Sequence, residues 1–188
     1  MQFDPSIAAT GRVLGTLVFA AAVAGKLRHW SEFTGVVANY KLLPQRLATP
    51  VAVLVVALES LVVASLLTGF SLAAGALLGV GLLGVFAVAM AVNLARGRRL
   101  IDCGCFQSAL RQHLSPSLVA RNVLLMAVLL VPALSARPFT APAAPQMFTA
   151  LQLLDGLGAG ITLFLIYLVS GELFALRDAV EALRKRFA

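Results

Sequence analysis

The sequence predicts an all-α integral membrane protein, a helical bundle of five transmembrane helices with amphipathic helices at the membrane interface. Of its 188 residues, 60% are hydrophobic and only 12% are charged, which is far from the charge content of an ordinary soluble domain. A helix needs roughly 20 apolar residues to cross ~30 Å of hydrocarbon, and the chain contains five such runs. Its net charge of +7 comes from short basic clusters between these runs, which suit anionic lipid and membrane topology. A nucleic-acid partner is therefore not expected.

The five predicted spans differ in how clearly their ends are marked. The first follows Asp4-Pro5-Ser6, a typical helix start, and no basic segment precedes it, so we do not expect it to be a cleaved signal. The fourth follows Ser115-Pro116-Ser117, and the fifth follows a proline-rich linker. The predicted spans are Ser6 to Leu27, Leu47 to Leu67, Phe70 to Ala95, Leu118 to Leu134 and Ala150 to Val169.

Short connections and small residues predict how the spans pack. Only Thr68-Gly69 joins the second span to the third, so these two should form a tight antiparallel hairpin. Glycines recur in the third and fifth spans at spacings that allow close helix approach in lipid. We interpret them as packing residues, since a dinucleotide-binding loop needs a preceding strand. They are Gly75, Gly79, Gly81 and Gly84, and Gly156, Gly158 and Gly160.

Two polar segments have helical amphipathic patterns. In the segment 28–46, Trp30, Phe33, Val37 and Tyr40 oppose His29, Glu32 and Asn39, which predicts a helix in the interface with its aromatic residues at headgroup level. After the fifth span, apolar residues three and four apart oppose charged ones. This tail would lie on the membrane surface or, alternatively, pack against a helix of a partner protein. We accordingly divide the chain into a transmembrane domain, 1–170, and an amphipathic C-terminal tail, 171–188.

The distribution of basic residues predicts orientation. With five spans, 28–46, 96–117 and the tail fall on one side, and thirteen of the fifteen basic residues are there. They are Lys26, Arg28, Lys41, Arg46, Arg96, Arg98, Arg99, Arg111, Arg121, Arg177, Arg184, Lys185 and Arg186; Arg12 and Arg137 remain opposite. The positive-inside rule then places the N-terminus outside, and the C-terminus in the cytoplasm.

Both cysteines of the chain, Cys103 and Cys105, lie in the segment RRLIDCGCFQS, with Gly104 between them. Such a pair can close a small, strained and readily reduced disulfide. The basic residues Arg98, Arg99 and Arg111 would favour the thiolate, whereas Asp102 opposes it. Two other interpretations remain open: the two thiols have no chemical function, or they form a metal site with His113. The spacing matches no usual zinc pattern, so no metal is expected.

Glu59 lies near the middle of the second span, where an unpaired carboxylate is costly. It should face the bundle interior, either as a proton relay or contact for a quinone-like cofactor, or as a structural group bonded to Ser60 or to a neighbouring helix. Asn93 and Asn122 flank the cysteine segment on the third and fourth spans. A structural role in fixing its geometry is the interpretation we favour for both.

Three pieces of the sequence together resemble a known family. They are GKLRHWSEFTGVVANYKLLP after the first span, VALES around Glu59, and NLARGRRLIDCGCF leading to Arg121-Asn122. In this order they are similar to the MauE family of methylamine utilisation proteins, within the DoxX-like membrane group. The resemblance covers roughly residues 20 to 125, although Gln107 stands where the family usually has glycine. It implies a DoxX-like four-helix core with the fifth span packed at its edge.

The resemblance also implies a maturation role, with a thioredoxin-like partner that helps to form the disulfides of the methylamine dehydrogenase small subunit. It assigns thiol-disulfide exchange to Cys103 and Cys105 and a membrane-core role to Glu59, in a bacterial inner membrane protein. That dehydrogenase matures outside the cytoplasm, whereas the charge pattern places the cysteines inside. Three explanations can reconcile the two. Electrons are passed across the bilayer to an outer partner, the cysteine segment enters the membrane, or the positive-inside rule does not hold for this chain. A non-catalytic scaffold and a thiol-based metal or small-molecule transporter are the alternative functions.

Overall fold

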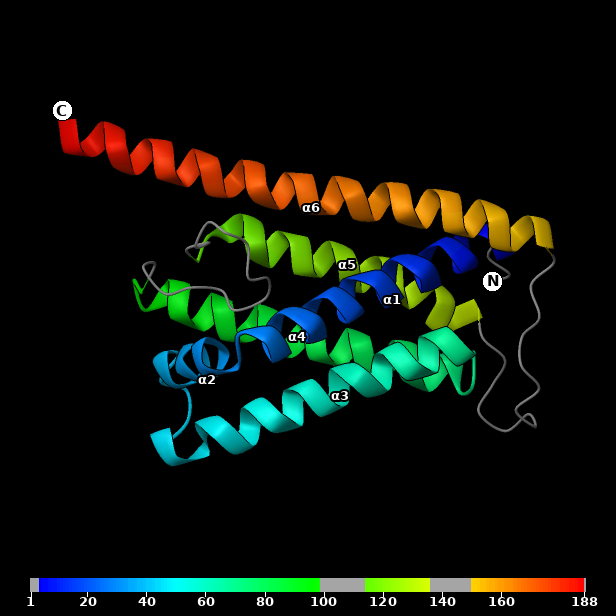
Figure 1. Cartoon of the computed structure of the whole chain (residues 1–188), viewed down its shortest axis with the longest axis horizontal. Coiled ribbons are helices and arrows are strands. Elements are labelled where there is room, and N and C mark those ends of the chain that lie inside the picture. Colours follow the sequence, from blue (N-terminus) through cyan, green and yellow to red (C-terminus); the bar gives the residue numbers. More distant parts are fainter. Residues whose placement is uncertain (1–3, 99–113, 136–149, 188) are drawn as a thin grey trace.

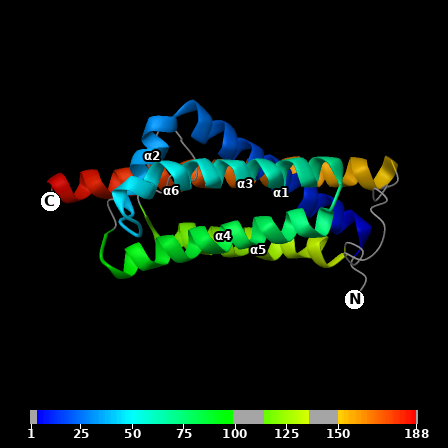
Figure 2. The same cartoon turned by 90° about the horizontal axis from the view of Figure 1, so that it is seen from below.

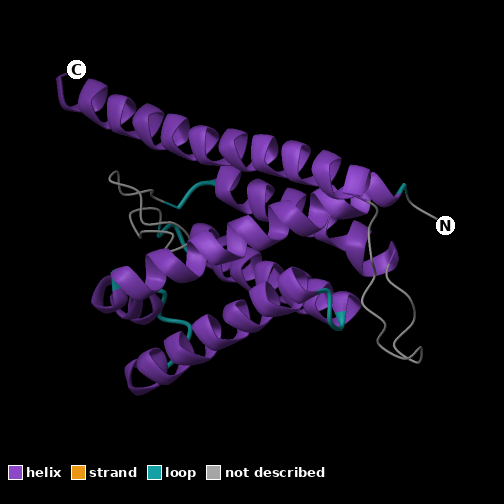
Figure 3. Ribbon diagram, turned by 45° about the vertical axis from the view of Figure 1, so that its right-hand side comes forward, coloured by secondary structure: helices purple, strands orange, loops and turns teal. Residues whose placement is uncertain are grey.

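The computed structural model describes residues 4–98, 114–135 and 150–187. These residues form α-helices, one short 3-10 turn and connecting loops, with no strand among them (Figure 3). The elements are α1 (Pro5–Arg28), α2 (Trp30–Asn39), η1 (Gln45–Leu47), α3 (Ala48–Thr68), α4 (Leu72–Ala95), α5 (Pro116–Ser135) and α6 (Ala150–Phe187). Five of them are long and apolar enough to cross a membrane. The predicted all-α membrane bundle is therefore confirmed.

Helix α1 is the centre of the bundle, because it packs against α2, α3, α5 and α6. Helix α4 runs alongside α5 and also contacts α3 (Figures 1 and 2). The main core lies between these helices, and Phe19, Val62, Leu66 and Leu129 are among its fully buried side chains. Helix α6 lies along α1 at one side of the bundle, as expected for a fifth span added to four (Figure 1).

The start of α1 and the turn between α3 and α4 follow from local chemistry. Asp4 caps α1 by accepting a hydrogen bond of 2.8 Å from the Ser6 amide, a preferred arrangement at helix starts. Gly69 ends α3 with a φ of 73°, a left-handed conformation that glycine adopts without strain. The predicted tight hairpin of α3 and α4 is thus present.

Arg12 has a structural role beyond its sequence-based interpretation. The sequence places it on the side opposite most basic residues, near the end of its span, and the structure gives it a specific partner: its guanidinium donates hydrogen bonds to the carbonyls of Leu66 and Leu67. These carbonyls belong to the last turn of α3, where no helical partner remains for them. Arg12 therefore ties α1 to the C-terminus of α3.

Helices α2 and α6 refine two further expectations. Phe33 of α2 is buried against Ala52 and Val56 of α3, so the apolar face of α2 is packed largely on the bundle. Helix α6 continues without a break from Ala150 to Phe187, although only Leu154–Leu173 is apolar enough to span a membrane. The tail is thus a direct helical extension of the fifth span.

Several of the predicted packing glycines lie at close helix contacts. A Cβ atom on Gly75 would approach Ser65 Cβ to 2.3 Å, and one on Gly156 would approach Ala9 Cβ to 2.7 Å. On Gly160 it would lie 2.6 Å from Val13 Cγ1. Gly158, by contrast, has nothing within 4 Å. Small residues thus allow α6 to approach α1, in the manner typical of helix pairs in lipid.

This contrast gives a test of the α1–α6 contact. Gly160→Ala should lower the stability of the purified protein by about 1–3 kcal/mol, because the added methyl group overpacks the interface. Gly158→Ala should leave it unchanged or raise it, since alanine is the better helix former. Thermal unfolding in detergent measures both variants. Equal melting temperatures for the two would contradict close packing of α6 on α1.

Candidate functional site

A buried ion pair joins α1 to α3 in the interior of the bundle. The Lys26 ammonium lies 2.6 Å from Glu59 Oε1 and 2.8 Å from Glu59 Oε2. The side chains of Lys26 and Glu59 are 3% and 1% exposed. Ser60, one of the partners suggested by the sequence, instead donates its hydroxyl to the Val56 carbonyl of its own helix. The partner of Glu59 therefore comes from a neighbouring helix.

Two aromatic rings lie close to the ammonium. Lys26 Nζ lies 5.3 Å from the ring centre of Phe33 and 5.5 Å from that of Phe86. A cation this close to aromatic rings is attracted by their negative faces, more strongly where water is excluded. Because an unpaired charge is costly in this setting, the carboxylate and the two rings together explain how a lysine is held here.

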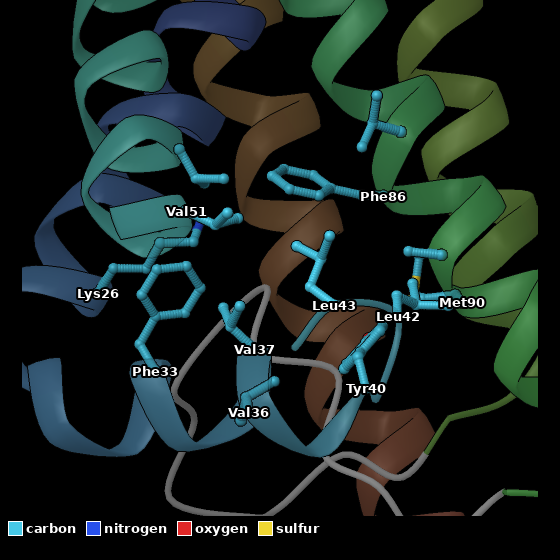
Figure 4. Close-up of a pocket in the computed structure, with 13 residues that line it drawn as sticks. Lys26, Phe33, Val36, Val37, Tyr40, Leu42, Leu43, Val51, Phe86 and Met90 are labelled. Atoms are coloured by element: carbon cyan, nitrogen blue, oxygen red, sulfur yellow. The ribbon is translucent and has the colours of Figure 1, made fainter. Parts of the chain in front are cut away.

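Two cavities adjoin the ion pair. The larger, of about 160 Å³, lies between α2, α3 and α4, and Lys26 is at its inner wall (Figure 4). The smaller, of about 30 Å³, is lined by both members of the pair together with Asn122 and Tyr167. Within the described part of the chain, the Asn122 side-chain nitrogen has no hydrogen-bond partner. Lys26 thus borders both cavities, whereas Glu59 borders the smaller one.

The segment that carries the cysteines leaves α4 through a well-defined helix end. Gly97 has a φ of 72°. Its amide bonds to the Leu94 carbonyl, while the Arg98 amide bonds to the Asn93 carbonyl. This pair of bonds is the Schellman ending, which strongly favours glycine. It accounts for the glycine in the NLARG stretch.

Arg98 then fixes this helix end to α2. Its guanidinium donates to the Asn93 side-chain oxygen at 3.2 Å and to the Tyr40 carbonyl at 3.3 Å. Asn93 is fully buried and also donates to the Ala89 carbonyl. On the other side of the cysteine segment, Leu114 is buried against Met90. Both residues that border the segment, Arg98 and Leu114, are therefore anchored on the bundle.

The remaining predicted site residues are distributed as follows. Cys103, Cys105, Arg99 and Asp102 lie outside the described residues, as does His113. Arg121 stacks over the ring of Tyr167, with its guanidinium carbon 4.7 Å from the ring centre. Asn122 lies beside the ion pair, whereas Asn93 lies beside Arg98. The two asparagines thus belong to two different sites.

Sequence reasoning missed the role of Lys26. It was counted among the interfacial basic residues because it is close to the end of its span, yet it is buried in α1. The available signal was an ionisable residue of opposite sign to Glu59, also inside a predicted span. Ionisable residues within spans usually pair with one another, so the two could have been matched.

The fold and this site define a multi-pass helical membrane protein with a buried lysine–glutamate pair beside an apolar cavity, and its outer helix faces contact the lipid bilayer. The chain belongs to a family of methylamine utilisation proteins: the family model described as methylamine utilisation protein MauE matches residues 4–135. This matched region contains helices α1 to α5. It therefore includes the ion pair, the larger cavity and the cysteine segment.

Two relatives carry the same description over most of their length. Methylamine utilization protein MauE of Paracoccus denitrificans is 39% identical over 171 residues, which cover 91% of this chain and 89% of that protein. Its counterpart in Paracoccus versutus is 42% identical over 150 residues, covering 80% of this chain and 77% of that protein. No solved structure matches this chain.

Proposed function

We propose that this protein is a membrane thiol-disulfide exchange protein. Cys103 and Cys105 carry the chemistry, and a thioredoxin-fold protein is the exchange partner. The client is a periplasmic protein of methylamine use, such as methylamine dehydrogenase. Membership of the MauE family supports a role in methylamine use, because the relatives are described as methylamine utilisation proteins.

The observation that carries the proposal is the anchoring of both residues that border the cysteine segment. Arg98 is held by Asn93 and Tyr40, and Leu114 is packed on Met90. A short segment fixed at both ends loses less conformational entropy when it forms an ordered complex. This anchoring supports the proposal, because a site that meets a protein partner needs rigid elements beside it.

The exchange conserves electrons and protons. A thiolate of one protein attacks a sulfur of the other protein's disulfide, which forms a mixed disulfide and releases a thiolate. The second cysteine of the attacking pair then displaces the partner, which leaves with both of its sulfurs reduced. Arg98 and Arg99, which precede the pair, favour the thiolate form of its cysteines, whether the thiolate attacks the partner's disulfide or leaves when the partner attacks.

For orientation, the proposal is a bacterial inner membrane protein with the N-terminus outside and the cysteine segment and C-terminus on the cytoplasmic side, so that electrons pass across the bilayer between the cysteines and the periplasmic client. Lys26 does not count toward this assignment, since it is buried and paired. The remaining basic residues still favour this orientation. A membrane-impermeant thiol reagent applied to intact cells and to inverted vesicles should label the cysteines only in the vesicles. Labelling in intact cells alone would reverse the assignment.

Trapping of the mixed disulfide tests the exchange itself. Cells that express Cys105→Ser or Cys103→Ser are quenched with acid, alkylated and separated without reductant. One of these variants should accumulate a covalent adduct with a thioredoxin-fold protein, identified by mass spectrometry, because its resolving thiol is missing. The adduct should disappear on reduction.

The control is a single cysteine placed elsewhere on the molecule. Ser31 is exposed on α2, so Ser31→Cys in the chain lacking Cys103 and Cys105 reports non-specific capture. The proposal requires no adduct from this control. Absence of a thioredoxin-fold adduct from both single-cysteine variants would contradict thiol exchange and favour a scaffold.

A further inference from the structure

The larger cavity is a wedge between diverging helices. Helices α3 and α4 meet at their hairpin, where Gly75 lies against Ser65, and they separate toward α2 (Figures 1 and 2). Leu42 and Leu43, on the connection between α2 and α3, reach into this space (Figure 4). The apolar cavity is therefore bordered by α2, α3, α4, one connecting segment and Lys26 of α1.

The walls of the cavity are almost entirely hydrocarbon. Phe33 and Val37 come from α2, Val55 from α3, and Phe86 and Met90 from α4. The ammonium of Lys26 is the charged group at the wall. A cavity of about 160 Å³ is comparable to an engineered apolar cavity that holds benzene. The size and the aromatic walls thus fit one flat ring.

The hydrogen-bond donors and the charge of Lys26 determine which kind of ring compound can bind. An ammonium has three N–H donors, and two of them are directed to the oxygens of Glu59. Because Glu59 already balances the charge, an anionic ligand would add an unpaired negative charge in an apolar site. A neutral ligand with a carbonyl oxygen can accept the third N–H without that cost. A plain acyl chain offers no acceptor.

We propose that this cavity binds the ring of a membrane quinone, with a ring carbonyl accepting a hydrogen bond from Lys26 and the ring lying between Phe33 and Phe86. A quinone is neutral, planar and soluble in lipid, and so meets each requirement of the site. This inference deepens the proposed function, because a quinone can take two electrons and two protons from a dithiol and become a quinol as the disulfide forms. Arg98 connects the cavity to the start of the cysteine segment, since it binds the carbonyl of Tyr40, which lines the cavity.

Binding of decylubiquinone to the purified full-length protein in detergent tests the inference. Ala89 lines the cavity on α4, so Ala89→Phe fills it while Lys26 and Glu59 themselves stay unchanged. This variant should weaken binding at least tenfold. Ala91→Phe, the same change on an exposed position of α4, should bind as the wild type does. Melting temperatures of the two variants without ligand check that both are folded.

Two further measurements isolate the carbonyl and the thiols. Decylbenzene, which lacks carbonyl oxygens, should bind at least tenfold more weakly than decylubiquinone. The variant with Cys103→Ser and Cys105→Ser should retain full decylubiquinone binding, so the cavity is tested apart from the thiol proposal. Equal binding by Ala89→Phe and Ala91→Phe, equal affinity for the two ligands, or no binding beyond that of empty micelles would overturn the inference.

Discussion

Glu59→Leu is expected to destabilise the protein by about 3–5 kcal/mol, since it leaves the Lys26 ammonium buried without its carboxylate. Both side chains are almost fully enclosed, so water cannot replace the lost partner. Phe33 and Phe86 still face the ammonium, but rings offset only a small part of the cost. Unfolding in mixed detergent micelles with increasing denaturing detergent measures the loss.

The paired variant separates the charge effect from the change of shape. Lys26→Leu combined with Glu59→Leu should be at least as stable as the wild type, because replacing a whole buried pair by apolar residues is often neutral or stabilising. Ser60→Ala is the matched control on α3, since Ser60 is exposed and its hydroxyl bonds to the Val56 carbonyl of its own helix. It should change stability by less than about 0.5 kcal/mol. A double variant as unstable as Glu59→Leu would show that the pair does not act as a unit.

Replacing both cysteines with serine should abolish the biological activity while leaving the fold intact. A hydroxyl is nearly the same size as a thiol, but it forms no disulfide, so no exchange step remains. The measurement is growth on methylamine of a bacterial host that lacks its own MauE protein and expresses this chain. The wild-type chain should restore growth, and the double variant should fail to do so.

Two controls complete this experiment: the amount of the double variant in the membrane, and a substitution at a serine unrelated to the cysteines. The double variant should reach the same amount in the membrane and the same melting temperature as the wild type. Ser115→Ala, which removes a hydroxyl contact of 2.7 Å with Ser117, should restore growth fully. Full growth with the double variant would eliminate the redox function and leave the scaffold as the better explanation.

The sequence predicted the features that depend on local pattern. Apolar run length gave the five spans, and the two-residue connection at Thr68-Gly69 gave the α3–α4 hairpin. The spacing of small residues predicted close helix packing at Gly156 and Gly160, and the structure shows that the neighbouring helix is α1. Each of these follows from one stretch of chain and the thickness or composition of the bilayer.

Features that depend on pairing between distant segments were not predicted. The bond from Arg12 to the Leu66 carbonyl joins residues 54 positions apart, and hydropathy carries no information about it. The same holds for Arg98 and Tyr40, which are 58 positions apart. Helical periodicity placed the aromatic residues of α2 correctly on one face, but it could not distinguish burial of Phe33 against α3 from contact with lipid headgroups.

The ion pair also constrains the order in which the chain can be inserted during synthesis. Lys26 precedes Glu59 by 33 positions, so the central helix emerges from the ribosome well before the segment that neutralises it. We expect α1 to remain near the translocon, in contact with water, until α3 has emerged from the ribosome. The first three helices would then move into the lipid together, as a single step of biogenesis.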